Sequence, residues 1–254
     1  MKAATLPGIR SRKMPPTRMH INEQDSPRHH FSQGRALEVQ RPLSEYYDAL
    51  FAAFGPQHWW PGETEFEVIV GEILTQKTSW RNAEHAIGNL RAEDLRSHAG
   101  IDKIPLTKLE RLIRPSGYFL QKARSLKAFC QFLQAGYGGS LKDLFETLTA
   151  ALREELRPIF GIGQETADSI LLYAGQHPVC VVDAYARSLL SRHGRVGENA
   201  KYEDIRSMFE FRFAGDHQKS NEFHALKVSG EATAAPTFPY ASTPGTLPGG
   251  RPLT

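Results

Sequence analysis

Cysteine is scarce in this sequence, with only Cys130 and Cys180 among 254 residues. Both lie in apolar stretches, so we expect two small core side chains in a reducing compartment rather than a disulfide framework. Long apolar runs are missing as well, since none approaches the roughly 20 residues that span a bilayer. The first residues also lack the charged and then apolar layout of a secretory signal. We therefore expect a cytoplasmic protein that does not bind a membrane.

Most of the chain also lacks an excess of positive charge. The formal net charge is +3, and residues 1–40 alone contribute +4, so the remaining residues are close to neutral at −1. A protein that binds nucleic acid through a broadly basic face carries a larger excess. Any nucleic-acid site must therefore be local, made of a small patch together with backbone amides.

The two terminal segments differ in composition from the rest. Residues 1–40 are rich in Pro, Arg, His and Ser without a helical or alternating pattern, which predicts a disordered basic arm. Residues 229–254 are rich in Ala, Thr, Pro, Ser and Gly with almost no charge, which predicts a disordered low-complexity tail. The folded domain is therefore expected at residues 41–228.

Between these segments, apolar residues recur at helical spacing, and no alternating strand pattern is longer than Val179–Val182. Thr64 and Glu67 have the spacing of a capping box, with the threonine before the first turn of a buried helix. The fold class predicted by this periodicity is all-α. Helices are expected to start near Ser44, Thr64 and Ser79, and to occupy 108–113, 119–133, 141–148, 184–192 and 202–213.

A turn with two glycines separates two further helical segments. Pro158 cannot continue the helix that ends near Leu156, and the glycines of Gly161-Ile162-Gly163 can adopt angles closed to other residues. Amide N–H groups beside the start of a helix suit a phosphate oxygen. We interpret the segment as a helix-hairpin-helix that grips a nucleic-acid backbone without reading its sequence. Turns of this kind also join helices that bind nothing.

Asp183 follows the apolar run Val179–Val182 and precedes a helix with Ala186, Leu189 and Leu190 on one side. It is therefore expected at the N-cap, where free N–H groups and the helix dipole favour a carboxylate. An N-cap aspartate is more often structural than catalytic, so position alone leaves both roles open.

Together these motifs resemble the endonuclease III superfamily of DNA glycosylases. Residues 161–167 match its hairpin and Val182-Asp183 its catalytic Val-Asp pair. Residues 59–61, 74–78 and 114–123 are similar to the 3-methyladenine DNA glycosylase III branch, which acts in alkylation repair. The similarity spans about residues 45–226. It implies two helical subdomains with a cleft between them, and a monomer that acts on double-stranded DNA containing a damaged base in the nucleoid.

The resemblance assigns a lesion pocket to Trp59, Trp60, Pro61 and Trp80, with Trp59 and Trp80 as the stacking pair. Aromatic faces suit an extruded base, because stacking is worth roughly 1–3 kcal/mol per base. Tryptophans beside a proline also pack beneath turns as minor core residues. Gln76 matches the position from which relatives fill the gap left by the flipped base, and a solvated residue at a helix end is the alternative. The expected DNA contacts of the hairpin are Gly161, Ile162, Gly163, Gln164 and Thr166.

The expected reaction depends on the negative charge of Asp183. Cleavage of an N-glycosidic bond leaves positive charge on the sugar, which the carboxylate of Asp183 is suited to stabilise. Bifunctional relatives carry a lysine directly before the Thr-Ala of the hairpin, and this chain has Glu165 there. Since a carboxylate cannot form a Schiff base, we predict a monofunctional enzyme. The resemblance implies that its substrates are alkylated purines.

No cofactor is expected. Many relatives hold an iron–sulfur cluster with four cysteines near the C-terminus, and this chain has no cysteine after Cys180. A cation bridging the hairpin carbonyls to phosphate is compatible with the resemblance. The sequence departs from the family after Phe223–Leu226, where relatives continue into a helical segment that helps close the pocket. The alternative functions are a noncatalytic helix-hairpin-helix protein and, disfavoured by Glu165, a bifunctional glycosylase for oxidised bases.

Overall fold

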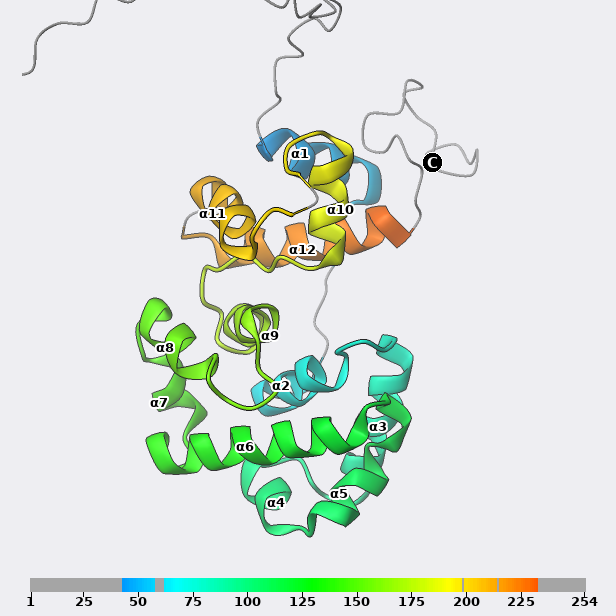
Figure 1. The fold of residues 1–254 in the computed structure, drawn as a ribbon, viewed down its shortest axis with the longest axis vertical. Coiled ribbons are helices and arrows are strands. Elements are labelled where there is room, and N and C mark those ends of the chain that lie inside the picture. The colour runs from blue at the N-terminus through cyan, green and yellow to red at the C-terminus, as the bar shows by residue number, and fades with distance from the viewer. Residues whose placement is uncertain (1–42, 58–61, 198, 214, 233–254) are drawn as a thin grey trace, which may run out of the picture. The chain divides into compact units, whose positions relative to one another are not determined.

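A computed structural model describes residues 43–57, 62–197, 199–213 and 215–232 of the chain. Every regular element in these ranges is helical, which confirms the predicted all-α class (Figure 1). The elements are α1 (Leu43–Phe54), α2 (Glu65–Leu74), α3 (Trp80–Ala92), α4 (His98–Lys103), α5 (Leu106–Leu112), the 3₁₀ turn η1 (Arg114–Ser116), α6 (Phe119–Tyr137), α7 (Leu141–Phe145), α8 (Thr149–Leu156), α9 (Gln164–Ser169), the π-helical segment η2 (Ile170–Ala174), α10 (Ala184–Arg192), α11 (Tyr202–Phe213) and α12 (His217–Ala232).

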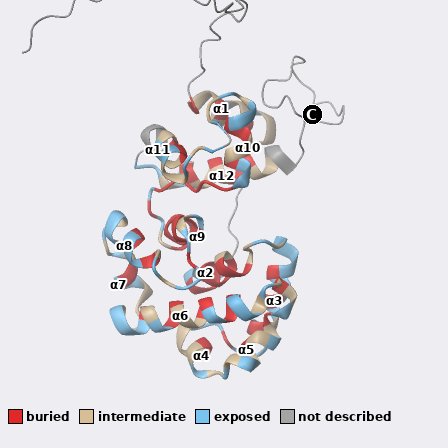
Figure 2. Cartoon of the chain, in the orientation of Figure 1, coloured by how far each residue is buried: buried red, intermediate tan, exposed pale blue. Residues whose placement is uncertain are grey.

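The apolar side chains divide into two separate cores, in agreement with the expected two subdomains. The larger core is built from α2 to α9 and η2, and Figure 2 shows its buried residues along the inner faces of these helices. The smaller core is built from α1, α10, α11 and α12, which are gathered together in Figure 1. Each helix thus covers one apolar stripe against a neighbour, as a surface helix must. The cleft expected between the subdomains includes residues 59–61, which lie outside the described residues.

The segment Val179–Val182 connects the two cores. It has no regular secondary structure, although its alternation resembles that of a strand. Val179 and Val181 pack in the larger core, whereas Cys180 and Val182 pack in the smaller one. Because its side chains alternate between the two cores, this short segment anchors both subdomains immediately before Asp183.

Several helix ends follow local signals in the sequence. Thr64 caps α2 through a 3.2 Å hydrogen bond from the Glu67 amide to its hydroxyl, as predicted. The Glu67 carboxylate accepts from the Glu63 amide at 3.2 Å, so only half of the expected capping box forms. Ser79 occupies the N-cap of α3 without a side-chain capping bond. Ser44 was expected to cap the first helix, but α1 already includes Leu43.

Two α-helices, α4 and α12, lie outside the helical segments predicted from the sequence. α4 is only 6 residues long, which is too short to give a clear helical periodicity. α12 runs to Ala232 and passes the boundary expected at residue 228. Its buried face includes Lys227 as well as apolar side chains, so its sequence does not show the continuous apolar stripe that predicts a helix.

The hairpin between α8 and α9 requires glycine at one of its two positions. Gly161 has a φ of +79°, and a Cβ atom there would lie 1.9 Å from the hydroxyl of Ser125 on α6. Gly163 is the N-cap of α9 with extended angles of −85° and −172°, and a Cβ atom there would have nothing within 4 Å. The first glycine therefore holds the turn against α6, while the second leaves open space at its surface.

We expect Gly161→Ala to lower the free energy of unfolding by about 2–4 kcal/mol, because a left-handed backbone and a steric clash act together. The matched control is Gly163→Ser, which places a good N-cap residue in open space and should change stability by less than about 1 kcal/mol. Urea unfolding followed by circular dichroism measures both changes. Equal stabilities of the two variants would contradict the assigned roles.

Candidate active site

Asp183 is the N-cap of α10, as the sequence predicts, and both oxygens of its carboxylate have hydrogen-bond partners. The Ala186 amide donates to Oδ1 at 2.7 Å. On the other oxygen, Oδ2 lies 3.0 Å from Nε2 of His224. The side chain of Asp183 is only 11% exposed. A carboxylate with this many donors in a buried setting has one well-defined orientation.

The charge on Asp183 is maintained by its neighbours. Burial by itself would raise the pKa of this carboxyl, but the ammonium of Lys227 and the contact with His224 outweigh burial, so the pKa lies well below its ordinary value. The Ala186 N–H contributes in the same direction. Asp183 is therefore an anion at any physiological pH.

Lys227 supplies the positive charge opposite Asp183. Its Nζ lies 3.9 Å from Asp183 Oδ1 and donates to the carbonyl oxygen of Val181 at 3.0 Å. The same ammonium lies 5.2 Å and 5.4 Å from the ring centroids of Phe209 and Phe223. Burial lowers the pKa of Lys227, and the negative charge of Asp183 opposes that shift. The lysine is thus a buried counter-charge fixed by a carbonyl and two aromatic faces.

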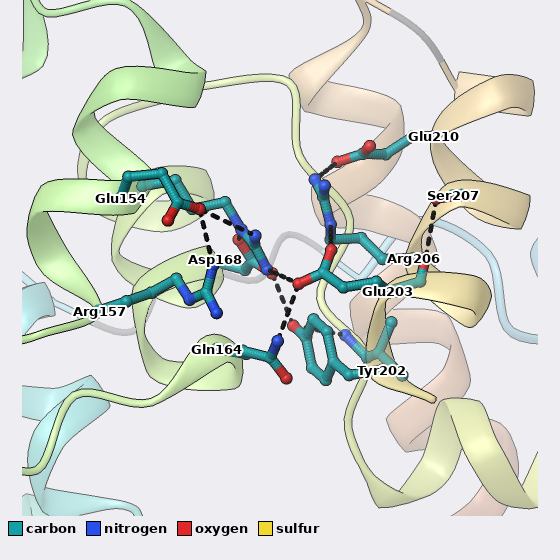
Figure 3. A network of polar contacts seen from close by, with 11 residues as sticks. Glu154, Arg157, Gln164, Asp168, Tyr202, Glu203, Arg206, Ser207 and Glu210 are labelled. Carbon is teal, nitrogen blue, oxygen red and sulfur yellow. Dashed lines mark hydrogen bonds and ion pairs between the residues drawn. The ribbon is translucent and has the colours of Figure 1, made fainter. Parts of the chain in front are cut away.

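A second polar network connects the hairpin to the residue before Asp183. Arg153 of α8 makes a paired contact with the fully buried Asp168 of α9, at 2.6 Å and 3.1 Å. The hydroxyl of Tyr202 donates to Asp168 at 2.7 Å and accepts from the Val182 amide at 3.3 Å. Figure 3 shows Asp168 and Tyr202 pointing toward each other from α9 and α11. The network therefore fixes the backbone at Val182 relative to the hairpin helices.

The predicted hairpin contacts differ in how far they are available to DNA. Gly161 and Gly163 are exposed at the turn. Ile162 is 2% exposed and its amide donates to Ile159 within the turn, so its side chain serves packing. Thr166 is also buried. The side-chain amide of Gln164 donates to Glu203 at 2.9 Å and belongs to the network of Figure 3.

The predicted lesion pocket is only partly within the described residues. Trp59, Trp60 and Pro61 lie outside them. Trp80 is the first residue of α3, 39% exposed, and its ring packs over the backbone of Gly71 on α2. Trp80 is thus partly exposed, and its role in the lesion pocket stays a prediction.

Gln76 lies just after α2, and its amide donates to the carbonyl oxygen of Glu72 at 3.1 Å. It is half-buried at this helix end, and its expected role in filling the gap left by a flipped base stays a prediction. Nearby, Lys122 is buried on α6 and donates to the carbonyl oxygens of Leu74 at 2.8 Å and Ser116 at 2.6 Å. Burial lowers the pKa of Lys122 to about 8. This lysine ties the end of α2 to the turn that precedes Tyr118.

Lys77 and Tyr118 form an exposed pair at the same turns. Both have left-handed backbone angles, with φ of 54° and 45°. The ammonium of Lys77 lies 6.0 Å from the Tyr118 ring centroid, and Tyr118 is 63% exposed. A cation beside an open aromatic face is suited to phosphate and base stacking, which makes this pair a candidate DNA contact. Sequence reasoning placed Tyr118 in a motif but gave it no role.

Further carboxyl groups act on this region. Glu72 of α2 has its pKa raised to about 7, first by burial and also by the negative charge of Glu165, while a hydrogen bond with Ser169 opposes the shift. The pKa of Glu165 is raised as well, by burial and then by the charge of Asp183. Electrostatic repulsion thus acts between Glu72 and Glu165 and between Glu165 and Asp183.

Sequence reasoning missed His224 and Lys227, which contact Asp183, and Tyr202, which holds the Val182 amide. His224 and Lys227 are three residues apart, which places them on one face of α12. That spacing was a usable signal, but only the folded chain shows that this face meets Asp183, 41 residues earlier.

Metal-site geometry does not occur among the described residues, where no three His, Cys, Asp or Glu side chains converge. Cys130 and Cys180 are free and buried, as expected for core residues. No helix in the described ranges has the length and apolar character needed to cross a membrane.

This chain is similar in sequence to proteins of a known family. The family described as HhH-GPD superfamily base excision DNA repair protein matches residues 70–213, which include the hairpin and Asp183. A protein of Methanocaldococcus jannaschii, provisionally named a DNA repair glycosylase, is 46% identical over 188 residues, or 73% of this chain and 85% of that protein.

Two solved structures show the same arrangement of helices. The 3-methyladenine DNA glycosylase of H. pylori, bound to 1,N6-ethenoadenine, has a TM-score of 0.65 at 28% identity and covers 74% of this chain and 96% of its own. A trapped covalent intermediate of endonuclease III with DNA has a TM-score of 0.64 at 20% identity and covers 80% of this chain and 88% of its own. The second likeness concerns the fold alone.

We expect Lys227→Met to lower the free energy of unfolding by about 3–5 kcal/mol near neutral pH, because it leaves a buried carboxylate without its counter-charge. The control Lys142→Met removes an ammonium from a side chain that is 82% exposed and should cost less than about 0.5 kcal/mol. Chemical denaturation of the two variants measures the difference. A Lys227→Met protein as stable as the wild type would contradict the assigned pairing.

Proposed function

Because the chain belongs to the HhH-GPD superfamily of base excision DNA repair proteins and is thereby a DNA glycosylase, we propose that it is monofunctional and removes alkylated purines of the 3-methyladenine type. The reaction is hydrolysis of the N-glycosidic bond. The observation that carries the proposal is the anionic, buried Asp183 beside Glu165, which occupies the position of the amine nucleophile in bifunctional relatives.

Asp183 would act on the sugar. As the base departs, positive charge develops on the deoxyribose, and a fixed carboxylate stabilises this charge more than it stabilises the neutral ground state. The same carboxylate can orient a water molecule or accept its proton. A carboxyl whose pKa lies below its ordinary value favours the electrostatic role over transfer of a proton to the base.

The side chains of Glu165 and Lys227 support the monofunctional assignment. Glu165 cannot form a Schiff base with the sugar. The ammonium near Asp183 belongs to Lys227, whose side chain is 3% exposed and held by the Val181 carbonyl. A lysine in that position serves as a counter-ion rather than as a nucleophile.

The carboxyl groups around the site support a cationic substrate base. Glu165 repels Glu72 and is itself repelled by Asp183, and a positively charged alkylated purine near Glu165 would relieve both repulsions. Trp80, together with Trp59, Trp60 and Pro61 as assigned by the resemblance, would supply aromatic faces for stacking and cation–π attraction. Cationic purines also leave readily, so the site does not need a strong acid.

Double-stranded DNA is the proposed macromolecular partner, bound by a monomer. The exposed glycines of the hairpin would approach the phosphate backbone, with Gln76, Lys77 and Tyr118 near the opened base pair. A bound cation at the hairpin carbonyls is compatible with this arrangement, and no iron–sulfur cluster is proposed.

We expect Asp183→Asn to reduce the excision rate by about 100- to 1,000-fold or more, because the amide cannot stabilise a sugar cation as an anion does. Its affinity for damaged duplex should stay within a few-fold of wild type. The control Asp204→Asn changes an exposed carboxylate on α11 and should leave both quantities unchanged. Single-turnover release of bases and a binding titration measure them. A wild type that binds DNA but releases no damaged base would favour the noncatalytic function.

Substrate class and reaction type are tested together on methylated duplex DNA. We expect release of free 3-methyladenine, with strand breaks appearing only after a separate alkaline treatment. Borohydride should trap no covalent protein–DNA adduct. Trapping of an adduct would contradict the monofunctional assignment, and equal excision of neutral oxidised bases would contradict selection of a cationic base.

A further inference from the structure

The catalytic proposal leaves one direct contact of Asp183 unexplained. His224 of α12 reaches Asp183 Oδ2 with Nε2 at 3.0 Å, and its other ring nitrogen, Nδ1, is hydrogen-bonded to the hydroxyl of Tyr173 on η2. The rings of Tyr173 and His224 lie 5.6 Å apart between centroids. The side chain of His224 is 13% exposed. Three elements far apart in the sequence therefore meet in one buried polar chain.

Elementary hydrogen-bond rules assign the protons in this chain. An ionised carboxylate only accepts, so Nε2 of His224 carries the hydrogen that is donated to Asp183. In a neutral imidazole Nδ1 is then an acceptor, and the Tyr173 hydroxyl donates to it. The order of donation is thus Tyr173 to His224 to Asp183. A neutral ring satisfies every atom of the chain, whereas a protonated ring would donate from Nδ1 to the Tyr173 oxygen and turn the hydroxyl hydrogen of Tyr173 away from His224.

The surrounding charges are consistent with a neutral ring. Burial lowers the pKa of His224, and the charge of Asp183 opposes this while Lys227 on the same helix reinforces it. The pKa of Tyr173 is raised well above its ordinary value by burial and by the charges of Glu72 and Asp183, so its hydroxyl keeps its hydrogen. The groups that face His224 therefore hold the chain in one protonation state across the neutral range.

We propose that His224 is a positioning residue for the glycosylase reaction, which orients the carboxylate of Asp183 and keeps it ionised. This inference rests on the proposed role of Asp183. With Ala186 holding one carboxylate oxygen and His224 the other, the side chain cannot rotate. Each oxygen still has a lone pair for water or for the sugar cation. Tyr173 sets the tautomer that makes this donation possible.

The test is the rate of base release in single turnovers on methylated duplex DNA, measured beside the affinity for that DNA and corrected for spontaneous release. His224→Ala removes the donor that orients a buried carboxylate, so the single-turnover rate should fall by about 10-fold or more while the affinity stays within a few-fold of wild type. His224→Gln places an amide N–H near the position of Nε2 and should restore most of the rate.

The control His217→Gln alters another histidine of α12 and should leave rate and affinity unchanged. Circular dichroism confirms that each variant is folded. A wild-type rate in His224→Ala, or a rate of His224→Gln as low as that of His224→Ala, would overturn the inference. A purely structural histidine would lower stability, and with it the rate and the affinity together.

A second readout does not depend on activity. Nitrogen-15 spectra of histidine-labelled wild type, with the His224 signal identified by its absence from His224→Gln, should show a neutral ring with hydrogen on Nε2 from pH 5 to 8. A protonated ring or hydrogen on Nδ1 in that range would overturn the inference, including when His224→Ala fails to fold. If the wild type releases no methylated purine, the proposed function fails, and the tautomer still decides whether His224 donates to Asp183.

Discussion

A buried carboxylate that remains ionised is the constraint on which this site depends. Removing an anion from water is costly unless donors and an opposite charge replace the lost hydration. Asp183 has three such partners, namely the first-turn amide of Ala186, the ring of His224 and the ammonium of Lys227. Two of the three come from α12, so this helix is part of the site as well as part of the smaller core. The charge that we propose to stabilise a sugar cation is therefore a property of the folded domain, and α10 alone would not provide it.

The position of that charge relative to DNA is set by a different group of contacts. Val179–Val182 is anchored in both cores, and Tyr202 joins the Val182 amide to the buried pair of Arg153 and Asp168 behind the hairpin. The hairpin proposed to bind the phosphate backbone is thus coupled to the residue before the proposed catalytic carboxylate through satisfied polar contacts (Figure 3). Such networks specify one geometry, which a reaction that requires the sugar next to the carboxylate needs.

Local features were predictable from sequence, and tertiary ones were not. α10 and α11 have the predicted bounds, and the N-cap role of Asp183 is confirmed, because capping residues and apolar periodicity act within a few residues. The resemblance of the sequence motifs to those of known glycosylases correctly identified the superfamily. His224 and Lys227 carried no such local signal, since a polar residue on a helix is usually solvated and only α12 packing against Asp183 gives them a role. Gln164 shows the opposite case, because a side chain expected at DNA is bonded to Glu203.

The central claim is that Asp183 faces the sugar as an anion, and the most direct measurement compares two abasic-site analogues in duplex DNA. One carries a cationic pyrrolidine ring in place of the sugar and resembles the charge of the transition state. The other carries a neutral tetrahydrofuran ring of similar shape. The account predicts that the wild-type protein binds the cationic duplex at least about 100-fold more tightly, and that Asp183→Asn loses most of this preference. Equal dissociation constants for the two duplexes in the wild type would contradict it.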